Sequence, residues 1–239
     1  MKNKDFFRPK KLSIEEIKSG CIYVYGEGNT DSQICVMNEE FRQGFDMVKK
    51  NKDGNKSVTF WGSARFPVDN EHYQKALRLS RRLAGELGCM IATGGGPGIM
   101  EAGNRGAYEM GKPSLGLTIE LPMEQSTNPY VTEEMPFYFF FSLKVLMAYS
   151  AEAYLYFPGG YGTLDELFEI LTLVQTGKIS RLPIILVGAA FWKPLDEFIK
   201  QTLLAEKGTI SESDLDLYII TDDEDKIVEM VRNAPMRND

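Results

Sequence analysis

The chain has few of the residues that metal centres and disulfide frameworks require. Of its 239 residues, the only histidine is His72, and the three cysteines Cys21, Cys35 and Cys89 are widely spaced, with no C-x-x-C pair. Such a composition predicts neither a zinc site nor a disulfide framework, and it is typical of the reducing cytoplasm. We therefore expect no metal in the functional site.

Long apolar runs and basic runs are also missing from the sequence. The apolar stretches fall far short of the roughly 18 residues that indicate a membrane span, and the first residues lack the apolar core of a signal peptide. The formal net charge is −7, which argues against a nucleic-acid surface. The sequence therefore predicts a soluble, unprocessed, cytoplasmic protein with neither a membrane nor nucleic acid as its partner.

The usual nucleotide-binding motifs are absent as well. No G-x-x-x-x-G-K-[ST] segment occurs, which excludes a P-loop kinase, and residues 94–98 read G-x-G-x-G without the last glycine of a dinucleotide fingerprint. Glu120 follows a predicted strand and could imitate the ribose-binding acid of such a site. A NAD-linked oxidoreductase is therefore kept as an alternative.

Short apolar runs alternate with amphipathic segments of helical length from residue 57 onward. This alternation predicts a doubly wound α/β fold, in which a mostly parallel, Rossmann-like sheet carries helices on both faces. Residues 56–239 are expected to form this nucleotide-binding domain, and residues 1–55 an N-terminal extension with a helix over 39–50. The predicted strands are residues 58–61, 90–93, 115–119, 137–141, 153–157, 183–187 and 217–220.

Two glycine-rich segments each follow a predicted strand and precede a predicted helix. Residues 94–101 read GGGPGIME, and residues 158–166 read PGGYGTLDE. Glycines allow the backbone to approach a ligand, and the free N–H groups of a helix N-terminus attract anions. The alternatives are a structural turn at 94–98 and a capping box between Thr163 and Glu166. We favour a phosphate site at the second segment, with Glu166 beside it on a sugar or a water.

Two further segments have simpler interpretations. The aromatic run at residues 137–141, FYFFF, is expected to be a buried strand rather than a platform for stacking bases. The acidic residues 222–225 are expected to cap the last helix, whose residues 227–231 then pack against the sheet.

The two glycine-rich segments together resemble those of the LOG ("Lonely Guy") family of cytokinin riboside 5'-monophosphate phosphoribohydrolases, once called lysine decarboxylases. Residues 60–65, 121–130 and 171–177 are similar to further segments of that family, and the resemblance covers roughly residues 39–232. It is closest to the longer bacterial branch. The segment at 158–166 is its most specific part.

The resemblance implies hydrolysis of the N-glycosidic bond of a nucleoside 5'-monophosphate by a dimer of Rossmann-like subunits, without a metal or redox cofactor. Glu166 would be the catalytic residue, because a carboxylate can stabilise the positive charge that develops at C1' as the base leaves. The residues that would bind substrate are Ser63, Gly95, Gly96, Gly98, Met100, Glu101, Pro158, Gly159, Gly160, Gly162 and Thr163.

The sequence departs from the family fifteen residues before Pro158. The family has an Arg-Lys pair there, whereas this chain has Leu143 followed by Lys144. Three interpretations follow: Lys144 substitutes, although adjacent helix residues point about 100° apart; Arg65 reaches in from a neighbouring loop; or the chain binds nucleotides with weak or lost catalysis. The candidate catalytic residues are thus Glu166, Lys144 and Arg65.

Overall fold

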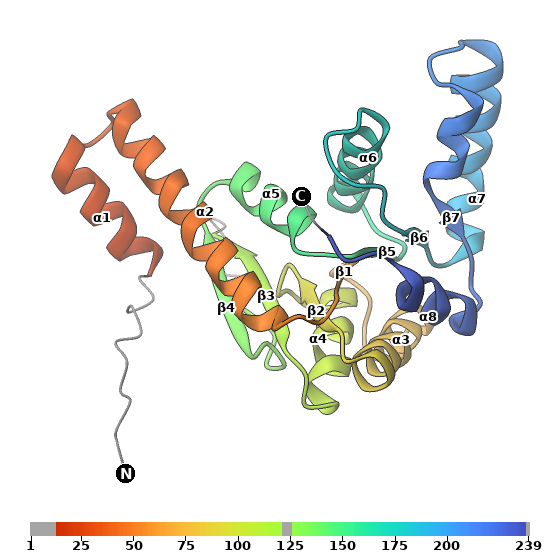
Figure 1. Ribbon diagram of the computed structural model, residues 1–239, viewed down its shortest axis with the longest axis horizontal. Helices are drawn as coiled ribbons and strands as arrows, with labels where there is room; N and C mark the ends of the chain where they lie inside the picture. The colour runs from red at the N-terminus through yellow and green to blue at the C-terminus, as the bar shows by residue number, and fades with distance from the viewer. Residues whose placement is uncertain (1–12, 121–125, 238–239) are drawn as a thin grey trace.

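The computed structural model describes residues 13–120 and 126–237, and Figure 1 shows a single sheet with helices around it. The strands pair in the order β4-β3-β2-β1-β5-β6-β7, and each pair is parallel. This order confirms the doubly wound α/β fold. The strands are β1 Ser57–Trp61, β2 Met90–Thr93, β3 Ser114–Ile119, β4 Glu133–Phe137, β5 Ala153–Tyr156, β6 Ile184–Leu186 and β7 Ile219–Ile220.

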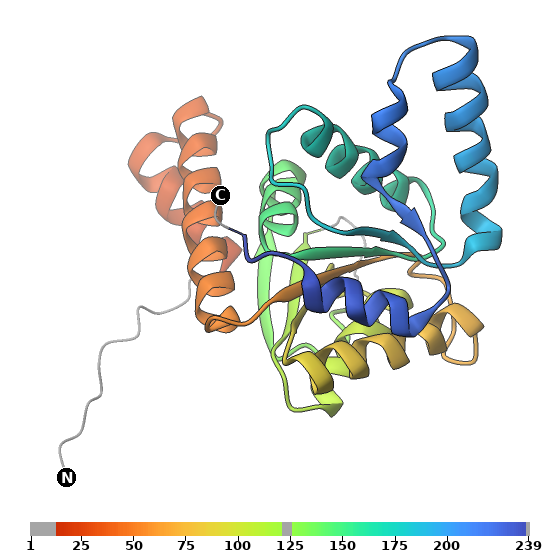
Figure 2. The same cartoon turned by 45° about the vertical axis from the view of Figure 1, so that its right-hand side comes forward.

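Helices cover both faces of the sheet, as Figure 2 shows. Along β1 and β5 alternate side chains enter opposite cores, so both strands are buried throughout. One core receives α3, α4 and α8, and the other receives α2, α5 and α6. The helices are α1 Ile14–Tyr25, α2 Thr30–Lys52, α3 Glu71–Leu87, α4 Ile99–Glu109, α5 Phe140–Tyr149, α6 Tyr161–Gln175, α7 Ala189–Phe198 and α8 Glu224–Asn233.

Two shorter helical segments complete the carboxyl-terminal part. The π-helical segment Ile199–Glu206 continues α7, and the 3-10 helix Glu212–Leu217 precedes β7. The acidic cap expected on the last helix is confirmed, because the Asp223 side chain accepts hydrogen bonds from the first backbone N–H groups of α8. Ile227, Val228 and Val231 then pack against the sheet.

The prediction of a buried strand over residues 137–141 is wrong. Strand β4 ends at Phe137, which lies opposite Ile119, the last residue of β3. The chain then turns into α5, and the side chains of Phe140 and Phe141 are about half exposed, at 56% and 49%. An aromatic run fits a strand or a helix equally well, and the end of β3 is what stops the strand.

The N-terminal region is a hairpin of two helices, and α2 is longer than the helix expected over 39–50. Asn29 caps α2, and Gly26 lies between the two helices with a positive φ of 89°. Met47 and Val48 of α2 enter the core that α5 and α6 share. The boundary at residue 55 remains a prediction, and α2 packs on the same core as the rest of the domain.

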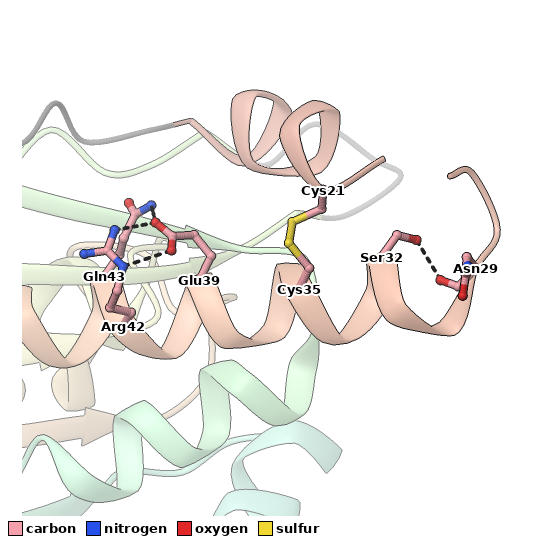
Figure 3. Close-up of a disulfide and its surroundings, with 7 residues drawn as sticks. All are labelled: Cys21, Asn29, Ser32, Cys35, Glu39, Arg42 and Gln43. Carbon is pink, nitrogen blue, oxygen red and sulfur yellow. Dashed lines mark hydrogen bonds and ion pairs between the residues drawn. A yellow bond between two sulfur atoms is a disulfide. The ribbon is translucent and has the colours of Figure 1, made fainter. Parts of the chain in front are cut away.

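A disulfide links the two helices of this hairpin, which corrects the expectation drawn from the cysteine count. Cys21 of α1 and Cys35 of α2 are bonded, with Cα atoms 5.8 Å apart (Figure 3). The antiparallel hairpin brings the two residues together despite their 14-residue separation. Cys89 is buried and free, and burial raises the pKa of its thiol to about 11.

Candidate active site

A cavity of about 1040 Å³ lies where β1, β2, β3 and β5 end. Parallel sheets bind ligands at this edge because the loops that follow neighbouring strands meet there. The cavity is lined by the loop after β1, by Gly94 and Met100 around the first glycine loop, by the second glycine loop, and by α5 and α6. Its size suits a nucleotide.

The second glycine loop and the start of α6 border the cavity. Helix α6 begins at Tyr161, and its N-cap residue Gly160 offers no side chain to the first N–H groups. The capping-box interpretation is therefore wrong: Thr163 and Glu166 both lie inside the helix. The free N–H groups and the dipole of a helix end favour negative charge.

The glycines of this loop differ in what surrounds them. A Cβ at Gly159 would lie 2.2 Å from the Oγ1 of Thr163, so the buried Thr163 side chain fills the space that a larger residue would need. A Cβ at Gly160 or Gly162 would meet no atom within 4 Å. Pro158 fixes the loop to the opposite side of the cavity, since its carbonyl accepts a hydrogen bond of 3.0 Å from the backbone N–H of Ser63.

Glu166 lies one turn into α6 and lines the cavity. Burial raises the pKa of its carboxyl group to about 9, the negative charges of Asp165 and Glu169 raise it too, and Lys144 opposes them. The backbone carbonyl of Glu166 accepts a hydrogen bond of 3.1 Å from the hydroxyl of Tyr156. A carboxyl group that is protonated at neutral pH can donate a proton to a substrate and then act as a carboxylate.

Leu143 and Lys144 point in different directions, as expected for neighbours on a helix. Leu143 is 6% exposed and forms part of the cavity wall. The ammonium of Lys144 lies instead 2.6 Å from the Asp165 carboxylate and 3.4 Å from that of Glu169. Lys144 is not among the residues that line the cavity, so it does not take the place of the missing arginine there.

Arg65 is the cation that does border the cavity. It lies in the loop after β1 with an exposed side chain, and its backbone N–H donates a 3.1 Å hydrogen bond to the Ser63 hydroxyl. Within residues 13–120 and 126–237, no carboxylate forms an ion pair with its guanidinium. Ser63 and Arg65 are thus both placed at the cavity, as the sequence predicts.

The first glycine loop contributes less to the cavity than expected. Gly95 and Gly96 border a small adjacent hollow of about 20 Å³. Gly98 has a φ of 68°, and its Cβ would lie 2.3 Å from the carbonyl oxygen of Ser63, so this glycine allows two loops to touch. Glu101 accepts a 2.7 Å hydrogen bond from Tyr73. Gly98 and Glu101 do not line the cavity.

A buried amide network that the sequence analysis missed fixes this loop. The Asn128 side-chain amide donates hydrogen bonds of 3.0 Å to the carbonyls of Gly95 and Gly96, and one of 2.8 Å to the Oδ1 of Asn104. Asn128 lies within the segment expected to match the family, residues 121–130, of which 121–125 lie outside the described residues. An asparagine in a polar loop carries no signal that separates such a role from a turn.

The end of the cavity nearest α5 is apolar. The Trp61 ring stacks on Tyr156 with centroids 6.1 Å apart, and its indole N–H has no hydrogen-bond partner within the described residues. We call this end the apolar wall; it consists of Trp61, Leu117, Ile119, Phe140, Leu143 and Met147. The first four of these residues lie in strands predicted from the sequence.

The alternatives that involve Glu120, metals and membranes can be compared with the structure. Glu120 pairs with Lys18 at 3.7 Å and does not line the cavity. Among the described residues, no group of three His, Cys, Asp or Glu side chains is placed to hold a metal ion. No helix within those same ranges has the length and apolar character that crossing a membrane requires.

The fold and the cavity define an α/β protein with a nucleotide-sized site at the carboxyl ends of its strands. The sequence model of the family described as "Possible lysine decarboxylase" matches residues 100–231, and the chain belongs to this family. The match confirms the resemblance to the LOG family on which the sequence analysis rests.

Two relatives whose names state an activity are similar to the chain over part of their length. The chain is 32% identical over 143 residues to the "Probable cytokinin riboside 5'-monophosphate phosphoribohydrolase LOG6" of Arabidopsis thaliana, an alignment that spans 59% of this chain and 69% of that protein. It is 33% identical over 160 residues to the "Pyrimidine/purine nucleotide 5'-monophosphate nucleosidase" of Escherichia coli K12, spanning 61% of this chain and 35% of that protein.

Solved structures show the same fold. The X-ray structure of TM1055 superposes with a TM-score of 0.56 at 23% identity, covering 74% of this chain and 98% of that one. The molybdenum cofactor carrier protein of Chlamydomonas reinhardtii superposes with a TM-score of 0.54 at 19% identity, covering 75% and 98%. At these identities the likeness concerns the fold alone.

Proposed function

We propose that the chain hydrolyses the N-glycosidic bond of purine nucleoside 5'-monophosphates, AMP-like or of the cytokinin type, giving the free base and ribose 5-phosphate. The observation that carries this proposal is the placement of an anion-binding helix end and the raised-pKa carboxyl group of Glu166 in one cavity. The relatives named for this reaction support it.

We propose the following orientation of the substrate in the cavity. The phosphate binds the backbone of Gly159, Gly160, Gly162 and Thr163 at the start of α6, where the helix dipole favours negative charge. The ribose then lies beside Glu166, one turn further along the helix. The base extends toward the apolar wall, and Met100 borders the same space. Phosphate binding thereby orients C1' for reaction.

The reaction needs a proton for the base and a water for C1'. As the bond from C1' to the base nitrogen breaks, Glu166 donates its proton to the departing base and becomes a carboxylate. That carboxylate stabilises the oxocarbenium-like C1' and accepts a proton from the attacking water, which restores the acid. Arg65 supplies positive charge at the cavity rim. No metal takes part in this scheme.

A second candidate function is nucleotide binding with weak or lost hydrolysis. The observation that favours it is the buried, uncharged Leu143 in the position where the family has its arginine. The two candidates differ in a direct assay. Purified protein is incubated with AMP and with its N6-isopentenyl analogue, and free base and ribose 5-phosphate are quantified. Base release supports hydrolysis, whereas tight AMP binding without base release supports the second candidate.

The compartment and the assembly belong to the same proposal. A nucleoside monophosphate substrate favours a cytoplasmic location, where the Cys21–Cys35 pair would be reduced; thiol trapping in cells measures that redox state. The resemblance favours a homodimer, and the half-exposed aromatic side chain of Phe141 is available for a contact. Sedimentation of the full chain tests the dimer.

A further inference from the structure

Glu40 is a fully buried acid that comes from the N-terminal hairpin and not from the family's matched region. It lies in the middle of α2 with no exposed surface. One carboxylate oxygen, Oε1, accepts a 2.5 Å hydrogen bond from the backbone N–H of Tyr138, and the other, Oε2, has no partner within the described residues. A charged group is rarely buried without a specific reason.

The contact of Glu40 lies at the N-terminus of α5. This helix has Phe139 as its N-cap and no capping side chain of its own. The Glu40 carboxylate accepts from the backbone N–H of Tyr138, the residue before that N-cap, so its charge lies near the positive end of the helix dipole. Burial raises the pKa of Glu40, while the backbone N–H of Tyr138, the hydroxyl of Ser142 and the backbone N–H of Phe139 favour its charged form. Helix α2 thus fixes the residue that leads into α5.

The start of α5 is also a wall of the cavity. Phe140 and Leu143 both lie in the first turns of α5, and both belong to the apolar wall. Phe139, immediately before them, packs against the hairpin cluster of Ile14, Ile17, Cys21 and Val36. The hairpin therefore holds this wall at two adjacent residues, by a hydrogen bond at Tyr138 and by apolar packing at Phe139.

We propose that Glu40 is a positioning residue for the base: it fixes the first turn of α5, and with it Phe140 and Leu143, against which the base packs. The proposal rests on the proposed function for the identity of the ligand. It assigns to the N-terminal hairpin a role in recognition of the base and not of the phosphate. Among the described residues, no hydrogen bond or ion pair links Glu40 to the phosphate site at the start of α6.

The test compares the Glu40→Ala and Glu40→Gln variants of the full chain with Glu39→Gln. Glu39 is the adjacent acid on α2, and it pairs with Arg42 on the outer side of that helix. Calorimetry measures the affinity of each protein for AMP and for ribose 5-phosphate, which lacks the base. We expect Glu40→Ala to bind AMP at least about tenfold more weakly, as one lost hydrogen bond to a charged group allows, with unchanged affinity for ribose 5-phosphate. Glu40→Gln keeps an acceptor oxygen and should lie between Glu40→Ala and wild type.

A second measurement does not depend on the ligand. Hydrogen exchange of the backbone amides of residues 138–143 is followed without ligand, and it should accelerate in Glu40→Ala but not in Glu39→Gln. Equal loss of both affinities, or unchanged exchange at these amides, would overturn the role of Glu40. If wild-type protein binds neither AMP nor ribose 5-phosphate, the proposed function fails, while the exchange result still decides whether Glu40 holds α5.

Discussion

The ammonium of Lys144 lies 2.6 Å from the carboxylate of Asp165, the residue next to Glu166. Lys144 is not among the residues that line the cavity, and it influences Glu166 through its charge. Its positive charge lowers the pKa of Glu166, against the larger effect of burial. The lysine that the chain shares with its family is thus in place, while the position of the arginine holds an apolar side chain.

Removing the charge of Lys144 should shift the pH dependence of hydrolysis. In our scheme Glu166 must be protonated, so activity falls as pH rises through its pKa of about 9. Lys144→Met removes a charge that favours the carboxylate, which raises this pKa and moves the alkaline limb to higher pH. Lys200→Met, which breaks an ion pair with Asp196, serves as the control. A shift of the limb to lower pH would contradict the account.

Restoring the family's cation should increase the rate. We expect Leu143→Arg to raise the rate of base release from AMP by about tenfold or more. A single hydrogen-bond donor aimed at developing charge typically changes kcat by a factor of about 10²–10³. Leu143→Met keeps the volume and adds no charge, and it should leave the rate near that of wild type. Equal rates for the two variants would show that the missing arginine does not limit this enzyme.

Glu166 should reduce the stability of the folded protein at alkaline pH. Its pKa is raised from 4.5 to about 9 on folding, so the folded state binds a proton that the unfolded state releases. The stabilising contribution is complete below about pH 4.5 and is lost as pH rises toward 9. Glu166→Gln should therefore melt at a higher temperature than wild type at pH 8 and not at pH 4.5. An exposed acid changed in the same way, Glu206→Gln, should show no such difference.

Breaking the disulfide should loosen the hairpin and leave the core intact. A cross-link between residues 14 apart stabilises by about 3 kcal/mol in the loop-entropy model. We expect the Cys21→Ser, Cys35→Ser double variant, or wild type treated with a dithiol reductant, to exchange amide hydrogens faster in α1. The amides of the central strands β1 and β5 should exchange as in wild type. Faster exchange in β1 or β5 would show that the hairpin supports the whole sheet.

The part of the fold that follows from apolar periodicity could be predicted from the sequence. Strands buried on both faces leave uninterrupted apolar runs, and six of the seven predicted strands match the structure. The strand over 137–141 failed because aromatic residues suit several environments, and only the end of β3 determines where β4 stops.

The candidate site was predictable where its chemistry lies in the backbone. The PGGYGT segment indicates a glycine loop and a helix start, and the structure has both. The roles of Glu40, Asn128 and the disulfide were not predictable, because each depends on a contact between segments distant in sequence. Glu40, for example, lies 98 residues from Tyr138 and has the sequence context of a surface acid.

The most direct test of the central claim is the stoichiometry of AMP turnover by wild-type protein and by Glu166→Gln. Adenine and ribose 5-phosphate are quantified together, with Glu169→Gln, a half-buried acid on the same helix, as the control. We predict that wild type and Glu169→Gln each release adenine and ribose 5-phosphate in equal amounts. The rate of release should fall by about 10²-fold or more in Glu166→Gln. AMP that binds wild-type protein without yielding adenine, or full activity in Glu166→Gln, would contradict the account.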